Sequence, residues 1–279
     1  MKTVAICGLG LIGGSFGLAL RQAGFEGEIV GLCGSPYAEQ ALQMGAISRV
    51  ARDLHEVAEC ADWIYLSDTV DGILATIRVL GPIAKAGTLI TDVGSTKTAI
   101  VSEATQHLRG AEFMGGHPIT GKEKRGIENA DADLFRNRPY VLTSRSESAN
   151  TKEFVFWLNN IGATVIYSTP AEHDRILGYT SHLPQLLSTA LAVTLARQNE
   201  RAFSEIFGPG LTDMTRLALS SGDLWIGILK TNKEVVKNAL LALEQTLEEL
   251  AKCLDADQLD SLFTRANEFA EKLRTNPKA

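Results

Sequence analysis

The stretch VAICGLGLIGGSFGLAL, near the start of the chain, constrains the fold more than any other part of the sequence. It sets Gly8, Gly10 and Gly13 in a G-x-G-x-x-G pattern. The pattern lies between a predicted strand, Thr3–Cys7, and a predicted helix, Ile12–Ala23. In such a turn the first glycine permits a tight bend, the second lets a phosphate approach the backbone, and the third allows close helix–strand packing. This arrangement predicts a Rossmann-type domain that binds a dinucleotide.

The predicted contacts to this dinucleotide come from Gly8, Leu9, Gly10, Leu11, Ile12 and Gly13. An acidic residue that binds the ribose 2′-hydroxyl of NAD is expected about 20 residues further on, at the end of the second strand. That strand, Glu28–Leu32, is followed instead by Cys33, Gly34 and Ser35. No carboxylate here repels a 2′-phosphate and Ser35 offers a donor, although no arginine is present to clamp the phosphate. We therefore expect NAD or NADP, with a slight preference for NADP.

Strand and helix patterns alternate through residues 1–169, which predicts a parallel sheet covered by helices. The predicted strands are Thr3–Cys7, Glu28–Leu32, Trp63–Leu66, Thr88–Asp92, Glu112–Met114, Tyr140–Thr143 and Thr164–Tyr167. The predicted helices are Ile12–Ala23, Tyr37–Met44, Gly72–Leu80, Thr96–Leu108 and Thr151–Asn160. Residues 170–279 show only helical periodicity. We expect an α/β protein with a Rossmann-type NAD(P)-binding domain (1–169) followed by an all-helical substrate and dimerisation domain (170–279).

Composition argues against several classes of partner. The formal net charge of −6 disfavours nucleic acids and anionic membranes, because both require a positive protein surface. The four cysteines form no C-x-x-C pair and no cluster with histidines at metal-ligand spacing. We therefore expect reduced thiols, no bound metal and a cytoplasmic protein. Because two-fold dimers are the commonest oligomers, we also expect a homodimer formed through the helical domain.

Two polar segments follow predicted strands at the edge of the sheet where ligands of open α/β sheets gather. TDVGSTKTAI places Ser95 between a strand and a helix, and taken alone this serine is a helix N-cap. MGGHPITGKEKRG places His117 after the strand Glu112–Met114. Gly115 and Gly116 precede the imidazole and are expected to leave open space beside it.

The helical region contributes two further polar segments, AEHDRILGYTSHLPQLL and GPGLTDMTRLALSSGDLW. Their candidate site residues are His173, Asp174, Ser181, His182, Gln185 and Arg216. The residues alone leave simpler interpretations open. His173 and Asp174 could cap a helix, and Arg216 could be a surface ion-pair partner.

Taken together, these segments resemble the prephenate and arogenate dehydrogenases of tyrosine biosynthesis. The matching motifs are GLGLIGGS, TDVGSTK, GGHPITGKEKRG, HDRILGYTSHLP and LTDMTRLA with LWIGILKTN. They span nearly the whole chain in the family's order. The resemblance implies a nucleotide-binding domain, a helical dimerisation domain and an active site in the cleft between them. It also implies that hydride passes from the carbinol carbon of a cyclohexadienol to nicotinamide while the ring carboxylate leaves as carbon dioxide.

The resemblance assigns roles to individual residues. His117 matches the catalytic histidine that accepts the hydroxyl proton, and an unperturbed pKa near ~6.5 would suit it to this task. Ser95 matches a catalytic serine that hydrogen-bonds near the same hydroxyl, and Arg216 matches the arginine that holds a substrate carboxylate. Glu123 matches an acidic gate in some members. The full set of expected substrate-binding residues is Arg216, His182, Ser181, Gln185, Glu123 and Thr120.

The sequence departs from the family pattern at two places. Gln185 stands where many relatives have a second histidine, which leaves open whether prephenate or arogenate is preferred. Asp68-Thr69 stands where relatives often have Thr-Pro. Ser67 and Asp68 are candidate cofactor contacts, although a helix cap is the favoured interpretation of Asp68.

The sequence leaves two other functions open. A β-hydroxyacid-type dehydrogenase shares the two-domain plan but requires a catalytic lysine in a K-x-x-x-N pattern, and the only such spacing is Lys272 with Asn276. A non-catalytic NADP-binding sensor would leave Ser95, His117 and Arg216 without a common purpose.

Overall fold

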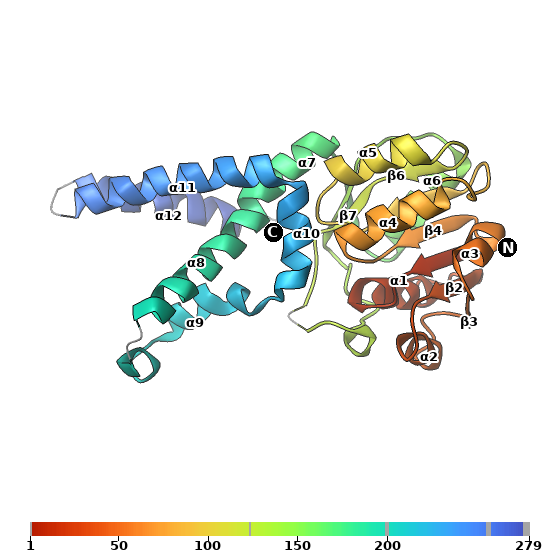
Figure 1. The fold of residues 1–279 in the computed structure, drawn as a ribbon, viewed down its shortest axis with the longest axis horizontal. Helices are drawn as coiled ribbons and strands as arrows, with labels where there is room; N and C mark the ends of the chain where they lie inside the picture. Colours follow the sequence, from red (N-terminus) through yellow and green to blue (C-terminus); the bar gives the residue numbers. More distant parts are fainter. Residues whose placement is uncertain (1, 123, 199–200, 255–257, 276–279) are drawn as a thin grey trace. The chain divides into compact units, whose positions relative to one another are not determined.

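The computed structural model describes residues 2–122, 124–198, 201–254 and 258–275, drawn in Figure 1. The chain divides into two compact units, Met1–Asn232 and Lys233–Ala279, and each is described by itself. The first unit holds a six-stranded sheet, a three-stranded sheet and the helices around them. The second unit holds α11 (Lys233–Cys253) and α12 (Gln258–Thr275). The predicted domain boundary at 169/170 stays a prediction.

The six-stranded sheet has the strand order of a dinucleotide-binding domain. Its order is β3-β2-β1-β4-β5-β6, and all five neighbouring pairs are parallel. The strands are β1 (Thr3–Cys7), β2 (Glu28–Leu32), β3 (Arg49–Val50), β4 (Trp63–Leu66), β5 (Leu89–Asp92) and β6 (Glu112–Met114). The order reverses between β1 and β4, and ligands of such sheets bind outside the carboxyl ends of the strands at this point. The predicted Rossmann-type fold is confirmed.

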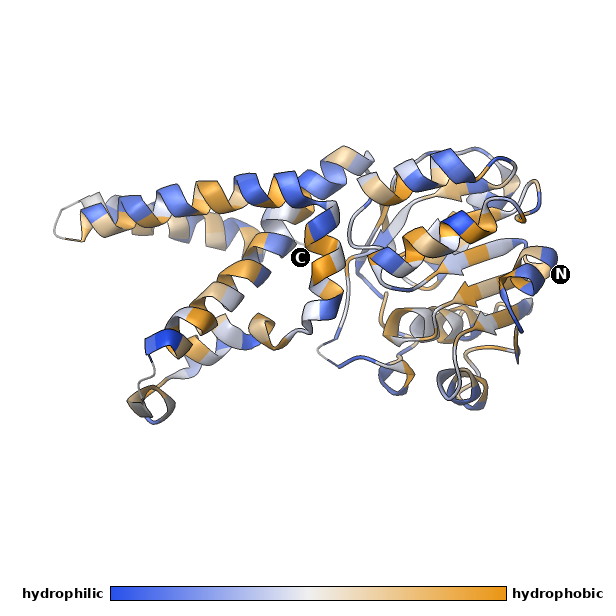
Figure 2. Cartoon of the chain, in the orientation of Figure 1, coloured by the Kyte–Doolittle hydropathy of each residue, from blue (hydrophilic) through white to orange (hydrophobic). Residues whose placement is uncertain are grey.

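Helices cover both faces of this sheet, as its strands require. Alternate residues of β4 point to opposite cores: Trp63 and Tyr65 to one, Ile64 and Leu66 to the other. The first core is completed by α1 (Leu11–Gln22), α2 (Tyr37–Gln43) and α6 (Ala149–Asn160). The second is completed by α3 (Leu54–Cys60), α4 (Val70–Leu80), α5 (Thr98–His107) and α10 (Gly222–Thr231). Figure 2 shows the hydrophobic residues in the middle of α10.

A second, smaller sheet carries the histidine segment. It consists of β7 (Gly116–Pro118), β8 (Pro139–Leu142) and β9 (Thr164–Tyr167). β7 pairs antiparallel with β8, which pairs parallel with β9. The predicted strands Tyr140–Thr143 and Thr164–Tyr167, expected in the parallel sheet, thus lie in this second sheet as β8 and β9. Hydrophobic patterning predicts that a segment is a strand but not which strand it pairs with. His117 lies in the middle of β7 rather than after the end of a strand.

Besides β7, the strand β3 and the helix α3 are absent from the prediction. β3 has only two residues, too few for a period-2 pattern to be recognised. α3 follows it, and its N-cap Asp53 accepts a hydrogen bond from the backbone N–H of Glu56. The Asp-x-x-Glu spacing is a helix-start signal that could have revealed this helix.

After Tyr167 the described residues contain helices and no strand, as the sequence predicts. The α-helices of this region within the first unit are α7 (Pro170–Leu177), α8 (Leu183–Gln198), α9 (Pro209–Thr215) and α10. A single π-helical turn, Gly178–His182, joins α7 to α8, and a 3-10 turn, Arg216–Leu219, follows α9. In the second unit, Arg265 of α12 pairs with Glu249 of α11 at 3.3 Å.

Candidate active site

The glycine turn after β1 brings the backbones of β1 and β4 into close contact. Gly8 has a φ of +99°, a conformation that favours glycine. A Cβ on Gly8 would lie 2.1 Å from the carbonyl oxygen of Ser67, which follows β4. A Cβ on Gly13 would lie 2.0 Å from the carbonyl oxygen of Gly8. Both positions therefore need glycine, as the G-x-G-x-x-G pattern predicts.

The N-terminus of α1 suits the pyrophosphate of a dinucleotide. Its N-cap residue, Gly10, provides no side-chain cap, and the first turn has no acidic residue. A Cβ on Gly10 would meet nothing within 4 Å, so space is open above the backbone. The unpaired N–H groups and the helix dipole favour an anion at this place. Leu9, Leu11 and Ile12 pack against the hydrophobic core, so their backbones rather than their side chains are available to a nucleotide.

A cavity of about 190 Å³ adjoins the glycine turn. It is lined by residues at or near the carboxyl ends of β1, β2 and β4 and by neighbouring helices: Cys7, Gly8, Leu32, Leu54, Leu66, Asp68, Ile73 and Thr76. Cys33, Gly34 and Ser35 follow β2, and Ser35 Oγ donates to Glu39 Oε1 at 3.2 Å. The predicted cofactor residues thus lie along one edge of the sheet, and the arrangement fits a nicotinamide dinucleotide.

The favoured role of Asp68 as a helix cap is wrong. Thr69 caps α4, because its Oγ1 accepts the backbone N–H of Gly72 at 3.2 Å. The Asp68 carboxylate accepts the N–H of Thr69 at 2.6 Å and lines the cavity described above. This position leaves Asp68 as a candidate cofactor contact.

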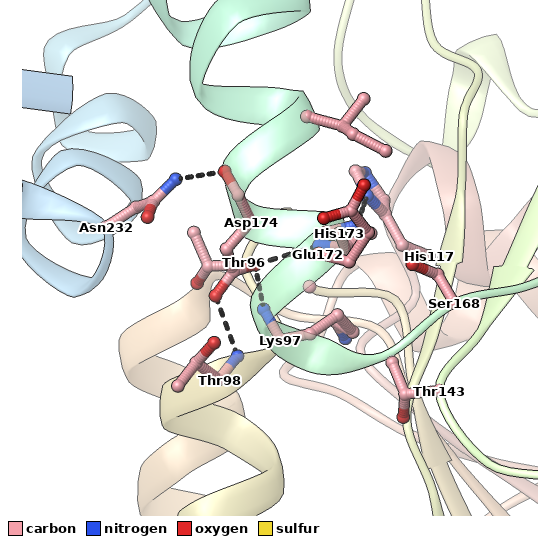
Figure 3. A network of polar contacts seen from close by, with 12 residues as sticks. Thr96, Lys97, Thr98, His117, Thr143, Ser168, Glu172, His173, Asp174 and Asn232 are labelled. Carbon is pink, nitrogen blue, oxygen red and sulfur yellow. Dashed lines mark hydrogen bonds and ion pairs between the residues drawn. The ribbon is translucent and has the colours of Figure 1, made fainter. Parts of the chain in front are cut away.

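A carboxylate from a distant helix caps α5, so the N-cap role considered for Ser95 is also wrong. Asp174 Oδ1 and Oδ2 accept the backbone N–H groups of Lys97 and Thr98 at 2.7 and 2.8 Å. Figure 3 shows Asp174 above this helix start. Ser95 lies half-buried in the turn between β5 and α5, where its hydroxyl is not needed as a cap.

A buried ion pair joins β5 to the histidine strand. Asp92 and Lys97 are both fully buried and pair with each other. Lys97 Nζ also donates to the carbonyl oxygen of Gly116 at 2.7 Å, and Asp92 Oδ1 accepts the N–H of Gly116 at 3.1 Å. Burial raises the pKa of Asp92 and lowers the pKa of Lys97, and their mutual attraction opposes both shifts. The pair therefore fixes the backbone immediately before His117.

The glycines before His117 do not leave open space for a substrate. A Cβ on Gly115 would lie 2.6 Å from Thr143 Oγ1, and one on Gly116 would lie 2.7 Å from the carbonyl oxygen of Asp92. The volume freed by the missing side chains is filled by the protein itself. The expectation of open space beside His117 is therefore wrong, and the glycines allow close packing of β5 and β8 instead.

His117 is a buried and neutral imidazole. Its exposed fraction is 8%, and its Nδ1 lies 2.8 Å from Nε2 of His173. Burial lowers the pKa of His117 well below 6.5, and the positive charges that His173 and Lys97 carry when protonated lower it further. The expected ordinary pKa is wrong, because glycine and proline neighbours do not reveal burial. An unprotonated imidazole at neutral pH can accept a proton.

Besides His173, the helical region contributes a second histidine, His182, to the network around His117. His182 is fully buried, and its Nδ1 lies 3.2 Å from Asn232 Nδ2, which also donates to the carbonyl oxygen of Asp174 at 2.8 Å. Asn232 can only donate through this nitrogen, so His182 carries its proton on Nε2. Burial lowers the pKa of His182 to about 4, so it stays neutral at neutral pH. Asn232 and Asp174 thus connect His182 to His173 and His117.

Three buried polar atoms beside this network have no hydrogen-bond partner among the described residues: His182 Nε2, Gln185 Oε1 and Trp225 Nε1. The rings of His182 and Trp225 lie 5.9 Å apart. Because buried polar groups normally have partners, these atoms mark a place where a polar ligand would be stabilised. His182 and Gln185 are both predicted substrate contacts. Ser181 lies half-buried next to His182.

Arg216 lines a larger cavity. The cavity measures about 530 Å³ and is bordered by Gly121, Lys122, Arg216, Leu217, Leu219 and Ser220. Gln185 Nε2 donates to the carbonyl oxygen of Leu217 at 2.8 Å, which connects α8 to this border. Thr120 Oγ1 donates to the carbonyl oxygen of Leu134 at 3.0 Å, so this hydroxyl anchors the loop after β7. Glu123, the predicted gate, lies outside the described residues. Asn276, which completes the K-x-x-x-N spacing with Lys272, also lies outside them.

Sequence reasoning names His173, Asp174 and His182 as candidates but does not show that they form one network with His117. The helix cap considered for His173 and Asp174 is confirmed for Asp174, which caps α5 rather than its own helix, α7. The cap of α7 is Thr169, whose side chain accepts the N–H of Glu172. Asn232 and Trp225 carry no signal that a single sequence reveals.

Two kinds of feature are absent from the described residues. No described helix is long and apolar enough to cross a membrane. No group of three or more histidine, cysteine or acidic side chains in the described ranges is placed to hold a metal ion.

Comparison with known proteins decides the family. Residues 16–167 match the model of the prephenate dehydrogenase nucleotide-binding domain, and residues 169–268 match that of the prephenate dehydrogenase dimerization domain. The chain belongs to the prephenate dehydrogenase family. It is therefore an oxidoreductase of tyrosine biosynthesis that uses a nicotinamide dinucleotide, as the sequence motifs imply.

Individual relatives agree with this assignment. The chain is 32% identical to prephenate dehydrogenase of Lactococcus lactis over all of this chain and 79% of the relative. The crystal structure of Aquifex aeolicus prephenate dehydrogenase with hydroxyphenyl propionate and NAD+ has a TM-score of 0.90 at 29% identity, over 98% of each chain. Synechocystis arogenate dehydrogenase has a TM-score of 0.82 at 28% identity, over 98% of this chain and 100% of the other.

Proposed function

We propose that this chain oxidises and decarboxylates prephenate, arogenate or both, with His117 as the base that accepts the substrate's hydroxyl proton. The observation that carries the residue assignment is the neutral, buried imidazole of His117, oriented by His173 in the segment beside the nucleotide-binding sheet. The product would be 4-hydroxyphenylpyruvate from prephenate and tyrosine from arogenate.

The chain's residues divide the work between binding and proton transfer. Nicotinamide supplies the hydride acceptor when bound. A departing hydride leaves positive charge on the carbinol carbon, so an imidazole that accepts the hydroxyl proton stabilises the transition state. Ser95, in the turn at the end of β5, can hydrogen-bond to the same hydroxyl. Loss of the ring carboxylate as carbon dioxide restores aromaticity, which makes the overall reaction favourable.

Arg216 and Lys122 make the larger cavity suitable for a substrate carboxylate. Replacing Arg216 with alanine should raise the KM for prephenate or arogenate by about 10–100-fold, since a hydrogen bond to a charged group contributes about 1.5–3 kcal/mol. The effect on kcat should be much smaller. Steady-state kinetics with varied substrate measures both. Arg52→Ala, at an exposed arginine of the nucleotide-binding region, serves as the control, and an unchanged KM in Arg216→Ala would remove Arg216 from the substrate site.

The choice between NAD and NADP depends on the turn after β2. Sequence alone slightly favours NADP because Cys33 replaces the usual acidic residue. In the folded chain, however, Glu39 brings a carboxylate within 3.2 Å of the Ser35 hydroxyl. This carboxylate would repel a 2′-phosphate, whereas it could accept the 2′-hydroxyl of NAD. Residues 33–43 contain no lysine or arginine to bind a phosphate. NAD is therefore the proposed preferred cofactor.

Replacing Glu39 with alanine tests this choice. The ratio of kcat/KM for NADP to that for NAD should rise by roughly fivefold or more, because two like charges about 4 Å apart repel by about 1 kcal/mol in water. Steady-state kinetics with each cofactor gives the ratio. Glu26→Ala removes an exposed carboxylate elsewhere in the same sheet domain and should leave the ratio unchanged. A wild type that prefers NADP, with no change in Glu39→Ala, would contradict the role of Glu39.

A homodimer formed through the helical region is part of the proposal. The matched dimerization-domain model covers residues 169–268. In the second unit, large apolar side chains are exposed on α11 and α12, among them Leu241, Leu247, Phe263 and Phe269. Large apolar side chains exposed along two helices of a dimerization domain favour association with a second copy. The four cysteines form no disulfide with one another, which supports the predicted cytoplasmic location.

Product analysis tests the proposed reaction. One substrate molecule should yield one reduced nicotinamide and one carbon dioxide. Detecting both products in equal amounts would exclude a sensor, which binds the cofactor without turnover. A folded protein that binds NAD or NADP but forms neither product from prephenate or arogenate would favour the sensor instead.

A further inference from the structure

A chain of three side chains from two elements ends at His117. His117 comes from β7, and His173 and Asp174 come from α7. Nδ1 of His117 lies 2.8 Å from Nε2 of His173, and Nδ1 of His173 lies 2.8 Å from Oδ1 of Asp174. His173 and Asp174 are buried, with exposed fractions of 1% and 3%. Figure 3 shows His173 and Asp174 on α7 with His117 beside them.

The ionised Asp174 sets the direction of its hydrogen bond with His173. Burial raises the pKa of Asp174, but hydrogen bonds from His173, Thr98 and Lys97 outweigh burial and lower it overall. An ionised carboxylate only accepts, so Nδ1 of His173 donates. With His173 in its neutral form, its Nε2 is an acceptor, and Nδ1 of His117 carries the proton that it donates to His173. Nε2 of His117 is left with a lone pair and has no hydrogen-bond partner among the described residues.

Asp174 is itself held in place from two further elements. The backbone N–H groups of Lys97 and Thr98 donate to its carboxylate at 2.7 and 2.8 Å. Its carbonyl oxygen accepts from Asn232 at 2.8 Å. The carboxylate therefore cannot rotate away from His173 without losing the cap of α5. A residue used only as a cap would not need a buried histidine as an additional partner.

We propose that Asp174 and His173 are positioning residues that hold His117 in the tautomer whose Nε2 accepts the hydroxyl proton of the substrate. This inference rests on the proposed role of His117 as the base. When the proton moves from the hydroxyl oxygen to Nε2, the O–H bond breaks and an N–H bond forms, and His117 becomes an imidazolium. Its Nδ1–H then donates to His173, and the Asp174 carboxylate stabilises the positive charge through that ring.

Two substitutions at His173 test the proposal by kinetics. His173→Leu removes the acceptor for His117 Nδ1–H and should lower kcat by about 100-fold or more. His173→Gln retains an amide oxygen that can accept this proton and should recover at least about tenfold of the loss. In both variants the KM for substrate and the dissociation constant of the cofactor should change by less than about threefold, because His173 is not placed to bind the substrate or the cofactor. His55→Leu, the same change at an exposed histidine of α3, should keep normal turnover.

Three kinetic outcomes would overturn the proposal: a kcat of His173→Leu within about threefold of the wild type, an equal loss in the leucine and glutamine variants, or a loss confined to KM. Spectroscopy gives a test that does not need activity. In nitrogen-15 spectra of the histidine-labelled wild type, the signals lost in His117→Asn identify His117. They should report protonated Nδ1 and unprotonated Nε2. The opposite tautomer would overturn the proposal even in a fully active enzyme.

The two tests separate this inference from the proposed function. If the wild type forms no product from either substrate, the proposed function fails, and the tautomer of His117 still decides whether Asp174 and His173 orient it. If the wild type is active and His117→Asn is not, the base is supported, and the His173 variants decide the positioning role alone.

Discussion

Replacing His117 with asparagine is expected to lower kcat by about 10²–10⁴-fold, the contribution typical of a general base. The amide of asparagine can still donate a hydrogen bond to His173, but it cannot accept a proton from the substrate. Because His117 belongs to β7 and not to the glycine turn, the affinity for the cofactor should stay nearly unchanged. Steady-state kinetics and a cofactor titration measure the two quantities separately.

A matched control for this variant lies on α5. His107 is 40% exposed and pairs with Glu103 at 3.0 Å, outside the network around His117. His107→Asn should therefore keep normal turnover. If His117→Asn also keeps normal turnover, the assigned proton transfer is wrong, whatever the reaction. If it loses cofactor affinity together with activity, the loss reflects a damaged site rather than a missing base.

Replacing Lys97 with methionine is expected to lower the free energy of unfolding by about 3–5 kcal/mol. Methionine keeps most of the apolar stem but leaves the fully buried Asp92 without its cation, and removing one partner of a buried pair has this effect. Urea unfolding followed by circular dichroism measures the change. Adding Asp92→Asn to Lys97→Met removes the unpaired charge, so the double variant should be more stable than Lys97→Met alone.

The control for this prediction is another lysine in an ion pair. Lys152 pairs with Glu147 at 2.8 Å, but both side chains are mostly exposed, 63% and 86%. Lys152→Met should change stability by less than about 1 kcal/mol, since exposed pairs contribute little. Equal effects of Lys97→Met and Lys152→Met would show that the buried pair does not hold β5 to β7.

The parts of the fold that depend on local chemistry could be predicted from the sequence. Gly8 and Gly13 sit where a side chain would collide with backbone, so their spacing, between a predicted strand and a predicted helix, identifies the turn. Strands such as Thr3–Cys7 and Trp63–Leu66 are predicted correctly because their residues are buried on both faces of a parallel sheet.

The parts that depend on contacts between distant segments could not be predicted. Asp174 caps α5 from 76 residues away, and no local pattern shows that it takes the place of Ser95. The contact between His117 and His173 joins residues 56 positions apart, on different elements. The lowered pKa of His117 follows from burial by those elements, which the neighbouring glycines and proline do not reveal.

The central claim is that this chain is a nicotinamide-dependent dehydrogenase of a cyclohexadienol with His117 as its base. A steady-state matrix of prephenate and arogenate against NAD and NADP, run in parallel for the wild type and His117→Asn, tests it most directly. We predict turnover by the wild type in at least one of the four combinations and a loss of at least about 100-fold in the variant. No wild-type turnover in any combination, or equal turnover in both proteins, would contradict the claim.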